Sequence, residues 1–235
     1  IVKLIVPMAG RAERFGGAFK PLLKKGDQYF IELVLASFTK LREEITEVCG
    51  ICTTEQEELY QISNSLVLSE NFDKLFFIDR QTEGPLETLQ EFFTKNPAWF
   101  QSVNLEEPII ICDCDHYLDL SIFDKRLLLS ADVILPTWRL KPGENSANWL
   151  IVKKVESGLE FAEKPLSAQH DQSQLGVIGC YFFKSISLFK KLITNTQGPS
   201  VSDIFKQHIL KIALFEVEEA SFFGDPKRLA EAQKK

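Results

Sequence analysis

One stretch decides the fold of this chain: I-V-P-M-A-G-R-A-E-R-F-G-G-A-F-K-P-L, over residues 5–22. Its start completes an apolar run over residues 2–8, broken only by Lys3, which is typical of a buried strand. A loop of small residues follows at once and carries Arg11, Arg14 and Lys20. Glycine permits close backbone approach, consecutive free amides form an anion-binding nest, and arginine offers forked donors for phosphate oxygens. The stretch predicts a strand and a phosphate-binding loop; taken alone, the loop is equally consistent with a plain surface turn.

The sequence downstream of this stretch alternates between strand-like and helix-like segments. Strands are expected over residues 2–8, 47–53, 75–79, 108–112 and 133–137, and helices over 30–41, 55–68, 86–95 and 121–130, with Ser121 as the N-cap of the last. Such β-α repetition predicts an α/β fold with a doubly wound, mixed and mainly parallel sheet that helices cover on both faces.

The second half of the chain follows a different pattern. Strands are expected over residues 149–155, 158–163, 177–183 and 213–217, with helices over 186–193, 201–210 and after Pro226. Residues 156–158 resemble a hairpin turn, and 141–148 and 167–173 resemble loops. Because no repeat or linker is visible, we expect a single domain over residues 1–235. Residues 1–137 would form its nucleotide-binding half and 138–235 its acceptor-binding half.

Composition restricts the class of protein. The chain has 235 residues, 45% hydrophobic and 26% charged, which is ordinary for a globular domain. Its net charge of −6 argues against nucleic-acid binding through a basic surface. No apolar run approaches membrane-spanning length and no secretory signal is visible, so neither membrane insertion nor secretion is expected. The chain begins without Met, which suggests trimming or a longer parent protein.

The cysteines indicate the compartment. Five cysteines is an odd number, which fits a reducing environment better than a disulfide scaffold, so we expect a cytoplasmic protein. Cys49 and Cys52 form a C-x-x-C, but they lie in an expected buried strand and no second pair at zinc spacing follows. Core cysteines are therefore favoured over a metal or redox site.

Acidic residues follow the apolar strand at residues 109–112. Asp113 and Asp115 would face the same way from an extended segment, while Cys114 would face the other. Ligands of open α/β sheets gather at the carboxyl ends of strands, and Mg²⁺ typically takes one or two carboxylates together with substrate phosphates. The pair is a candidate Mg²⁺ site, with Mn²⁺ as the alternative ion and solvated turn acids as the structural alternative.

Two further segments carry weaker signals. Glu163 and Lys164 follow the expected hairpin, and their side chains would face opposite ways, one toward hydroxyl groups and the other toward a phosphate. Taken alone, a solvated Glu-Lys pair is the better interpretation. Gln81 and Gly84 follow the third strand, where an amide beside a glycine can address the edge of a base.

Together, and in this order, these pieces resemble the sugar-phosphate nucleotidyltransferases, the NTP-transferase enzymes that make nucleoside-diphosphate sugars and related activated headgroups. The resemblance spans nearly the whole chain. The matching segments are P-M-A-G-R-A-E-R-F (7–15), K-P-L-L (20–23), Q-T-E-G-P (81–85), C-D-H (114–116), E-K-P (163–165), G-C-Y-F-F (179–183) and G-D-P-K-R-L (224–229).

The resemblance implies a Rossmann-like nucleotidyltransferase fold and a Mg²⁺-dependent transfer of a nucleotidyl group from an NTP to a sugar 1-phosphate or headgroup phosphate. The short format is similar to the cytidylyl- and uridylyltransferases of surface-polysaccharide and headgroup pathways, in a monomer or small homo-oligomer. The implied catalytic residues are Arg14, Lys20 and Asp115, with Asp115 and Asp113 as metal ligands. The implied nucleotide-binding residues are Ala9, Gly10, Arg11, Gln81 and Gly84, and the implied acceptor-binding residues are Glu163, Lys164 and Gly179.

The sequence also departs from the family pattern. The N-terminal loop has fewer glycines than usual, and a second metal-binding aspartate is expected near the C-terminus, where Phe222 stands at or near the position and Asp225 is out of step. Two alternatives stay open. Asp113-x-Asp115 would also suit a glycosyltransferase that holds a metal and a nucleotide sugar, and the absent aspartate would suit a non-catalytic nucleotide-sugar binder. The sequence names neither the base nor the acceptor.

Overall fold

The computed structural model describes residues 1–124, 126–141, 149–156, 158–163 and 175–234. Its strands are β1 (Val2–Pro7), β2 (Lys24–Lys25), β3 (Gln28–Tyr29), β4 (Ile45–Thr53), β5 (Lys74–Ile78), β6 (Ile109–Cys112), β7 (His116–Leu118), β8 (Val133–Arg139), β9 (Leu150–Val155), β10 (Gly158–Glu163), β11 (Leu175–Val177), β12 (Cys180–Phe183), β13 (Ile212–Glu216) and β14 (Ala220–Phe222). Its helices are α1 (Phe30–Ala36), α2 (Thr54–Tyr60), α3 (Leu66–Asn71), α4 (Pro85–Lys95), α5 (Pro97–Ser102), α6 (Leu127–Ser130), α7 (Ile186–Thr194), α8 (Asp203–Gln207) and α9 (Pro226–Ala232).

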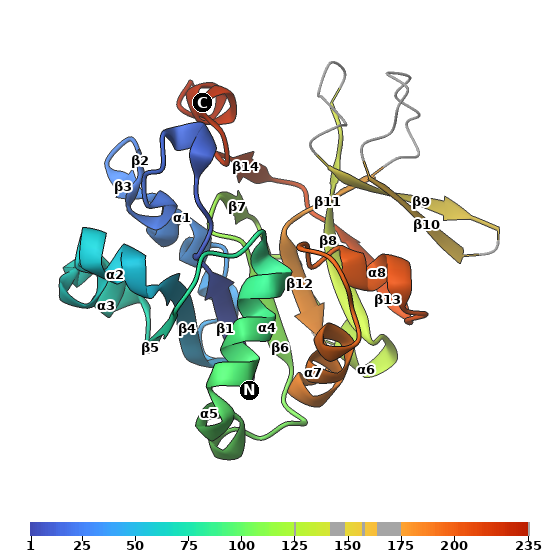
Figure 1. Cartoon of the computed structure of the whole chain (residues 1–235). Helices are drawn as coiled ribbons and strands as arrows, with labels where there is room; N and C mark the ends of the chain where they lie inside the picture. The colour runs from blue at the N-terminus through green and yellow to red at the C-terminus, as the bar shows by residue number, and fades with distance from the viewer. Residues whose placement is uncertain (125, 142–148, 157, 164–174, 235) are drawn as a thin grey trace.

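A ten-stranded mixed sheet runs through the described part of the chain in the order β10-β9-β11-β8-β12-β6-β1-β4-β5, with β13 paired to β8 (Figure 1). Strands β5, β4, β1 and β6 pair in parallel, as does β13 with β8. Strand β12 runs antiparallel to both β6 and β8, and β9 and β10 form an antiparallel hairpin. The predicted α/β fold with a mixed sheet is confirmed.

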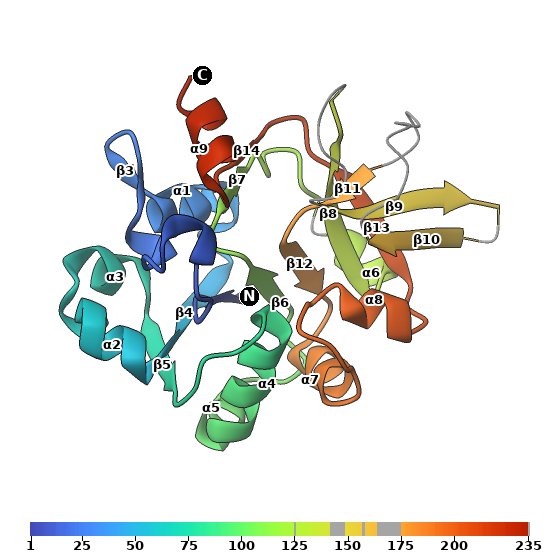
Figure 2. The ribbon, with the colours of Figure 1, turned by 45° about the horizontal axis from the view of Figure 1, so that its top comes forward.

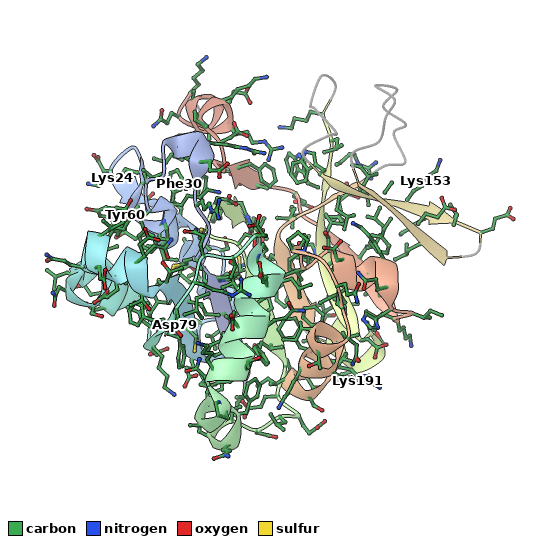
Figure 3. All side chains as sticks on the ribbon, in the orientation of Figure 1. Lys24, Phe30, Tyr60, Asp79, Lys153 and Lys191 are labelled. Atoms are coloured by element: carbon green, nitrogen blue, oxygen red, sulfur yellow. The ribbon has the colours of Figure 1, made fainter. Side chains whose placement is uncertain are left out.

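The alternation of apolar side chains along β1 explains why helices cover both faces of the sheet. Leu4 and Val6 belong to one buried cluster, which α1 and α3 complete, whereas Ile5 belongs to a second cluster, which α4, α5, α7 and α8 complete. Phe30 of α1 is fully buried in the first cluster, whereas the exposed Lys191 of α7 projects to the periphery (Figure 3). A strand buried on both faces reads as a continuous apolar run, as β6 does and as β1 does after Lys3.

The strand order reverses at β1. The chain leaves β1 to one side through β4 and β5 and returns on the other side as β6. Ile5 is paired with Ile111, so the segments that follow β1 and β6 emerge side by side at the carboxyl edge of the sheet. Ligands of open α/β sheets bind at such a switch point. In Figure 2 the terminal helix α9 lies at this edge, beside β14 and β7.

Several predicted elements are wrong in their extent, among them the helices expected over 30–41 and 201–210, which are shortened to α1 (Phe30–Ala36) and α8 (Asp203–Gln207). The helix expected over residues 55–68 is broken at Gln61, whose left-handed backbone (φ 50°) ends α2 before α3 begins. The strand expected over 177–183 divides at Ile178 and Gly179 into β11 and β12, which have different partners. The helix expected over 121–130 is reduced to α6, because Ser121 donates to the Asp119 carboxylate through its amide (2.8 Å) and hydroxyl (3.0 Å) instead of capping a helix.

The remaining expectations on local structure are only partly addressed. The loop expected over 167–173, almost all of that over 141–148, and Ser157 in the hairpin turn lie outside the described residues. The functional division into residues 1–137 and 138–235 stays a prediction. None of the helices formed by the described residues is long and apolar enough to cross a membrane.

Candidate active site

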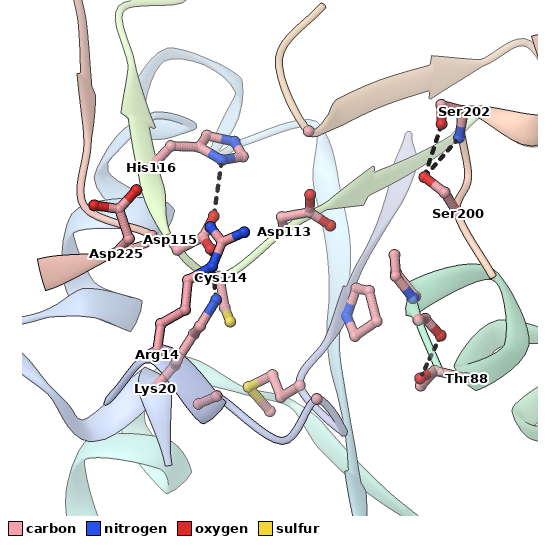
Figure 4. A pocket seen from close by; sticks show the side chains of 18 of the residues that line it. Arg14, Lys20, Thr88, Asp113, Cys114, Asp115, His116, Ser200, Ser202 and Asp225 are labelled. Atoms are coloured by element: carbon pink, nitrogen blue, oxygen red, sulfur yellow. Dashed lines mark hydrogen bonds and ion pairs between the residues drawn. The ribbon is translucent and has the colours of Figure 1, made fainter. Parts of the chain in front are cut away.

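A cavity of about 750 Å³ opens at the carboxyl edge of the sheet, where the segments after β1, β6 and β11 meet (Figure 4). Its lining includes the predicted residues Ala9, Gly10, Arg11, Arg14, Lys20, Gly84, Asp113, Asp115 and Gly179. The parallel pairing of β1 with β6 and the antiparallel pairing of β6 with β12 bring these segments together from distant parts of the sequence.

The segment after β1 carries Arg14 and Lys20, two of the predicted cations. Ala12 adopts a left-handed backbone (φ 47°) that starts a single 3₁₀ turn over Glu13–Phe15, and Gly16 ends the turn with φ 66°. Arg14 lies on this exposed turn, and among the described residues its guanidinium has no hydrogen bond or ion pair. Figure 4 shows Arg14 extending beside Lys20 toward Asp115. The loop therefore offers an unpaired forked donor at the cavity.

Two glutamine side chains hold this loop from behind. Gln56, the N3 residue of α2, donates its amide hydrogens to the carbonyl oxygens of Met8 (3.2 Å) and Gly10 (3.3 Å). Gln81 donates to the carbonyl oxygen of Ala9 at 2.9 Å. Gln81 lines a second, smaller cavity, of about 460 Å³, which it shares with Gly10 and Arg11, and not the larger one. Its structural position is thus that of a loop brace, and its predicted contact with a base stays a prediction.

Lys20 and Asp115 form the central ion pair of the site. Lys20 Nζ lies 2.8 Å from Asp115 Oδ2, and both side chains are about one quarter exposed, at 25% and 26%. Burial alone would lower the pKa of Lys20 and raise that of Asp115. The attraction between the two charges outweighs this cost, so the pKa of Lys20 is raised and that of Asp115 is lowered. Both groups are therefore charged at neutral pH.

His116 supports Asp115 from the other side. Its imidazole is buried, with Nδ1 3.7 Å from Asp115 Oδ1 and Nε2 3.6 Å from the sulfur of Cys112. His116 is the first residue of β7, which pairs with β14 of the C-terminal segment. The ring limits the orientations open to the Asp115 carboxylate.

Asp113 is electrostatically strained. Burial, followed by repulsion from Asp115, raises the pKa of Asp113 to about 7. Among the described residues, no side chain forms a hydrogen bond or ion pair with its carboxylate. The backbone amide of Asp113 donates to the carbonyl oxygen of Gly179 at 2.7 Å, and a Cβ atom at Gly179 would lie 2.0 Å from Asp113 Oδ2. The absence of a side chain at Gly179 thus creates the space for this carboxylate.

The C-terminal segment reaches the same carboxylates through an unpredicted strand. Phe222 of β14 pairs with His116 of β7, and the amide of Phe223 donates to the carbonyl oxygen of Asp115 at 3.0 Å. The ring of Phe222 packs edge-on against Trp149 at 4.7 Å, so this position supplies an aromatic wall and no carboxylate. Asp225 lines the cavity, but it caps α9 by accepting the amide of Arg228 at 2.9 Å.

The remaining predicted residues are placed as follows. Gly84 is extended and lies against Pro199, whose carbonyl oxygen would be 2.4 Å from an added Cβ atom. The exposed Arg11 guanidinium lies 3.9 Å from the carboxylates of both Glu13 and Glu83. Glu163 is the last residue of β10. Lys164 lies outside the described residues.

The cysteine pair is buried in the core. Cys49 belongs to one buried cluster and Cys52 to the other, because residues three apart on a strand face opposite sides of the sheet. Burial raises the pKa of both thiols. The preference for core cysteines over a metal or redox site agrees with this placement.

Sequence reasoning missed several residues of the cavity wall. Trp149 lies at the cavity below the guanidinium of Arg228, whose Cζ atom is 4.9 Å from the centre of the ring. Thr82 and Thr88 share a 2.6 Å hydrogen bond at another wall. The family resemblance covers the G-D-P-K-R-L segment without assigning a role to any one of its residues. A basic residue one turn after an aspartate that caps a helix is the signal that could have indicated Arg228.

Comparisons with known proteins address the fold. No protein-family model matches the sequence, and no curated protein matches it. A nucleoside-diphosphate-sugar pyrophosphorylase from Vibrio cholerae superposes with a TM-score of 0.71 at 17% identity, over 99% of this chain and 100% of that one. A protein from Bacillus anthracis described as a glucose-1-phosphate thymidylyltransferase, solved with sucrose, superposes with a TM-score of 0.72 at 14% identity, over 100% of this chain and 94% of that one. The chain therefore has the fold of the sugar-phosphate nucleotidyltransferases.

Proposed function

We propose that this protein transfers a nucleotidyl group from an NTP to a small phosphorylated acceptor, a sugar 1-phosphate or a related headgroup phosphate, and releases pyrophosphate. One observation carries the proposal: the cations Arg14 and Lys20 and the carboxylates Asp113 and Asp115 line a single cavity at the switch point of the sheet. That combination suits a reaction in which two phosphate-bearing molecules must be held together despite their mutual repulsion.

The reaction makes modest demands on covalent chemistry. An oxygen of the acceptor phosphate forms a bond to the α-phosphorus, the bond from that phosphorus to the bridging oxygen breaks, and the electron pair leaves with pyrophosphate. Arg14, unpaired on its turn, would bind the leaving β- and γ-phosphates. Lys20 would donate to an oxygen of the α-phosphate, where negative charge must be stabilised as the bonds exchange.

The residues present fit a magnesium ion. Among the described residues, no group of three or more His, Cys, Asp or Glu side chains converges as a metal cage. Mg²⁺ needs no such cage in a nucleotide site, because one or two carboxylates and the substrate phosphates suffice. Asp113, with no partner of its own in the described structure and an unfavourable neighbour in Asp115, has the chemistry of such a ligand. A bound Mg²⁺ would neutralise phosphate charge.

The test is pyrophosphate release from each common NTP, with Mg²⁺ and a panel of sugar 1-phosphates and headgroup phosphates. We expect one combination to turn over, and Arg14→Ala and Asp115→Ala to lose on the order of a hundredfold or more in turnover, as charged transition-state contacts do. Arg42→Ala removes an exposed arginine just before β4, at the opposite edge of the sheet, and should keep normal turnover.

Three outcomes would contradict the proposal. Near-normal turnover by folded Arg14→Ala or Asp115→Ala protein would remove the assigned roles. Hydrolysis or transfer from nucleotide sugars, without pyrophosphate release from any NTP, would favour the glycosyltransferase alternative. Binding of nucleotide sugars with no turnover of either kind would favour a non-catalytic binder.

A further inference from the structure

Arg228 is a cation of the cavity wall to which no motif assigned a role. It lies on α9, lines the cavity, and keeps 21% of its side chain exposed. We propose that Arg228 binds the phosphate group of the acceptor. This inference rests on the proposed function, and it names the residue that selects a phosphomonoester as the second substrate.

Aromatic rings fix the position of the guanidinium group. The Cζ atom of Arg228 lies 4.9 Å from the centre of the Trp149 ring and 5.7 Å from that of Phe222. These two rings meet each other nearly at right angles, at 89°. A cation over a ring face is held by the ring quadrupole, and this contact uses none of the N–H donors. The aromatic contacts therefore position the side chain and leave its N–H groups able to donate hydrogen bonds to a ligand.

The donors of Arg228 are largely uncommitted. Its Nε atom forms an ion pair with Asp225 Oδ2 at 3.7 Å, which is too long for a hydrogen bond, and the other oxygen of Asp225 accepts the backbone amide of Arg228. Within the described residues, no acceptor forms a hydrogen bond with the guanidinium. A rigid fork of free N–H donors beside a cavity matches the oxygens of a phosphate dianion, which it can bind in a bidentate manner.

Trp149 provides a second and independent observation at the same wall. Its indole nitrogen is buried and has no hydrogen-bond partner among the described residues, although the residue lines the cavity. A buried donor without a partner costs free energy, so its presence indicates that an acceptor atom is supplied by something other than this part of the chain. The nitrogen is itself buried, so an oxygen of a bound acceptor molecule or of a water would satisfy this donor only once the ring turns toward the cavity.

Charge favours the acceptor phosphate over the triphosphate as the group that Arg228 binds. The N-terminal loop already supplies Arg14 and Lys20, whereas Trp149, Phe222 and Arg228 all come from the second half of the chain. A phosphomonoester carries close to two negative charges at neutral pH, and it must approach both the carboxylates and the α-phosphate. Arg228 would supply a cation for this phosphate from α9, in addition to Lys164, which the family resemblance assigns to the acceptor and which lies outside the described residues.

The experiment measures phosphate binding separately from catalysis. Inorganic phosphate and glucose 1-phosphate are titrated into the protein by calorimetry and by tryptophan fluorescence, since Trp149 lies under the guanidinium. Arg228→Met keeps an unbranched apolar side chain for the aromatic rings and removes the charge and the fork. Arg228→Lys keeps the charge alone. Lys227→Met, one residue earlier and exposed, is the matched control.

We expect Arg228→Met to weaken binding of these phosphate probes on the order of tenfold to a hundredfold, with Arg228→Lys between it and the wild type and Lys227→Met unchanged. The thermal stabilisation by the NTP that the wild type prefers should be the same in all four proteins. If Arg228→Met fails to fold, the comparison of Arg228→Lys with the wild type decides the matter.

Three results would overturn the inference: no binding of either probe to the wild type, unchanged phosphate binding by the Arg228 variants, or an equal loss of NTP stabilisation, which would assign Arg228 to the triphosphate. The proposed function fails separately. If the wild type releases no pyrophosphate but the Arg228→Met substitution still weakens phosphate binding, the phosphate site stands and the proposed reaction fails. If the wild type is active but Arg228→Met binds phosphate as well as the wild type does, the reaction stands and the role of Arg228 fails.

Discussion

Replacement of Gln56 by leucine tests how the N-terminal loop is held. Gln56 is buried, and its side chain makes three hydrogen bonds: it accepts the amide of Thr53 at 2.9 Å and donates to the carbonyl oxygens of Met8 and Gly10. Leucine has a similar volume and cannot replace any of these bonds. The substitution therefore removes one half of the capping box of α2, the bond from the Thr53 amide, and both contacts to the loop, while the bond from the Gln56 backbone amide to the Thr53 hydroxyl remains.

The magnitude follows from those three bonds. A hydrogen bond contributes about 0.5–1.5 kcal/mol net to stability, and more when its loss leaves a buried partner unsatisfied. Thr53 and Met8 are buried, whereas Gly10 is exposed and its carbonyl can be hydrated. We therefore expect Gln56→Leu to lower the free energy of unfolding by about 2–3 kcal/mol. The released loop should also bind a triphosphate less well, so the thermal stabilisation by NTP should fall.

Urea denaturation measures the first effect and a thermal-shift titration with NTP the second. Gln56→Glu is informative beside Gln56→Leu: it keeps an acceptor for Thr53 but places a carboxylate oxygen against two carbonyl oxygens, so its penalty should shrink as the pH is lowered through the pKa of the new carboxyl group. Glu58→Ala, exposed on the same helix, should change stability by less than about 0.5 kcal/mol. A Gln56→Leu protein as stable as Glu58→Ala, with the wild-type NTP response, would refute the brace.

Two further outcomes follow from single positions. Gly179→Ala would place a methyl group 2.0 Å from Asp113 Oδ2, so the carboxylate must turn away; we expect a folded protein with turnover reduced on the order of a hundredfold, and unchanged pyrophosphate release would contradict the geometry. Burial tends to raise the pKa of Glu47, but hydrogen bonds from Lys74, Trp99 and a thiol outweigh it, so the pKa of Glu47 is lowered in the folded protein. The ionised Glu47 therefore stabilises the fold above its unfolded pKa near 4.5, and this stabilisation is lost as the pH falls through the lower folded pKa. Glu47→Gln should be less stable than the wild type by about 1–2 kcal/mol at pH 7, and urea curves should show this gap closing in acid; a gap independent of pH would contradict it.

The sequence predicts the centre of this fold well because its strands are buried on both faces. An apolar run such as that ending at Pro7 or Cys112 has few alternatives to a central strand, and the acids and glycines that follow must then emerge at one edge of the sheet. Arg14, Lys20, Asp113, Asp115 and Gly179, predicted from separate segments, line one cavity for this reason.

What the sequence does not predict depends on single long-range contacts. Strand β14 is three residues long and forms by pairing with β7, about a hundred residues away in the chain. It is too short for an alternating hydrophobic pattern in the sequence to predict it. The sequence also does not predict the hydrogen bonds from Gln56 to the N-terminal loop. A glutamine at the third position of a helix is explained by its part in a capping box, which Gln56 also forms. Gln81 shows the same limit, since its amide donates to the Ala9 carbonyl and not toward the larger cavity.

The pairing of Lys20 with Asp115 has a consequence for how substrate enters the proposed site. Each charge neutralises the other, so an NTP that draws Lys20 away would leave Asp115 without its lysine partner, and a cation that binds Asp115 would leave Lys20 without its carboxylate. An NTP that arrives together with its metal ion satisfies both at once: the phosphate oxygens replace Asp115 for the lysine, and the ion replaces the lysine for Asp115. On the proposed function, binding of the NTP alone or of the metal ion alone would therefore be less favourable than binding of each in the presence of the other. Linkage requires that each ligand strengthen the binding of the other by the same factor. On the proposed function, the ion pair makes the site respond to the metal–nucleotide complex more strongly than to its separate components.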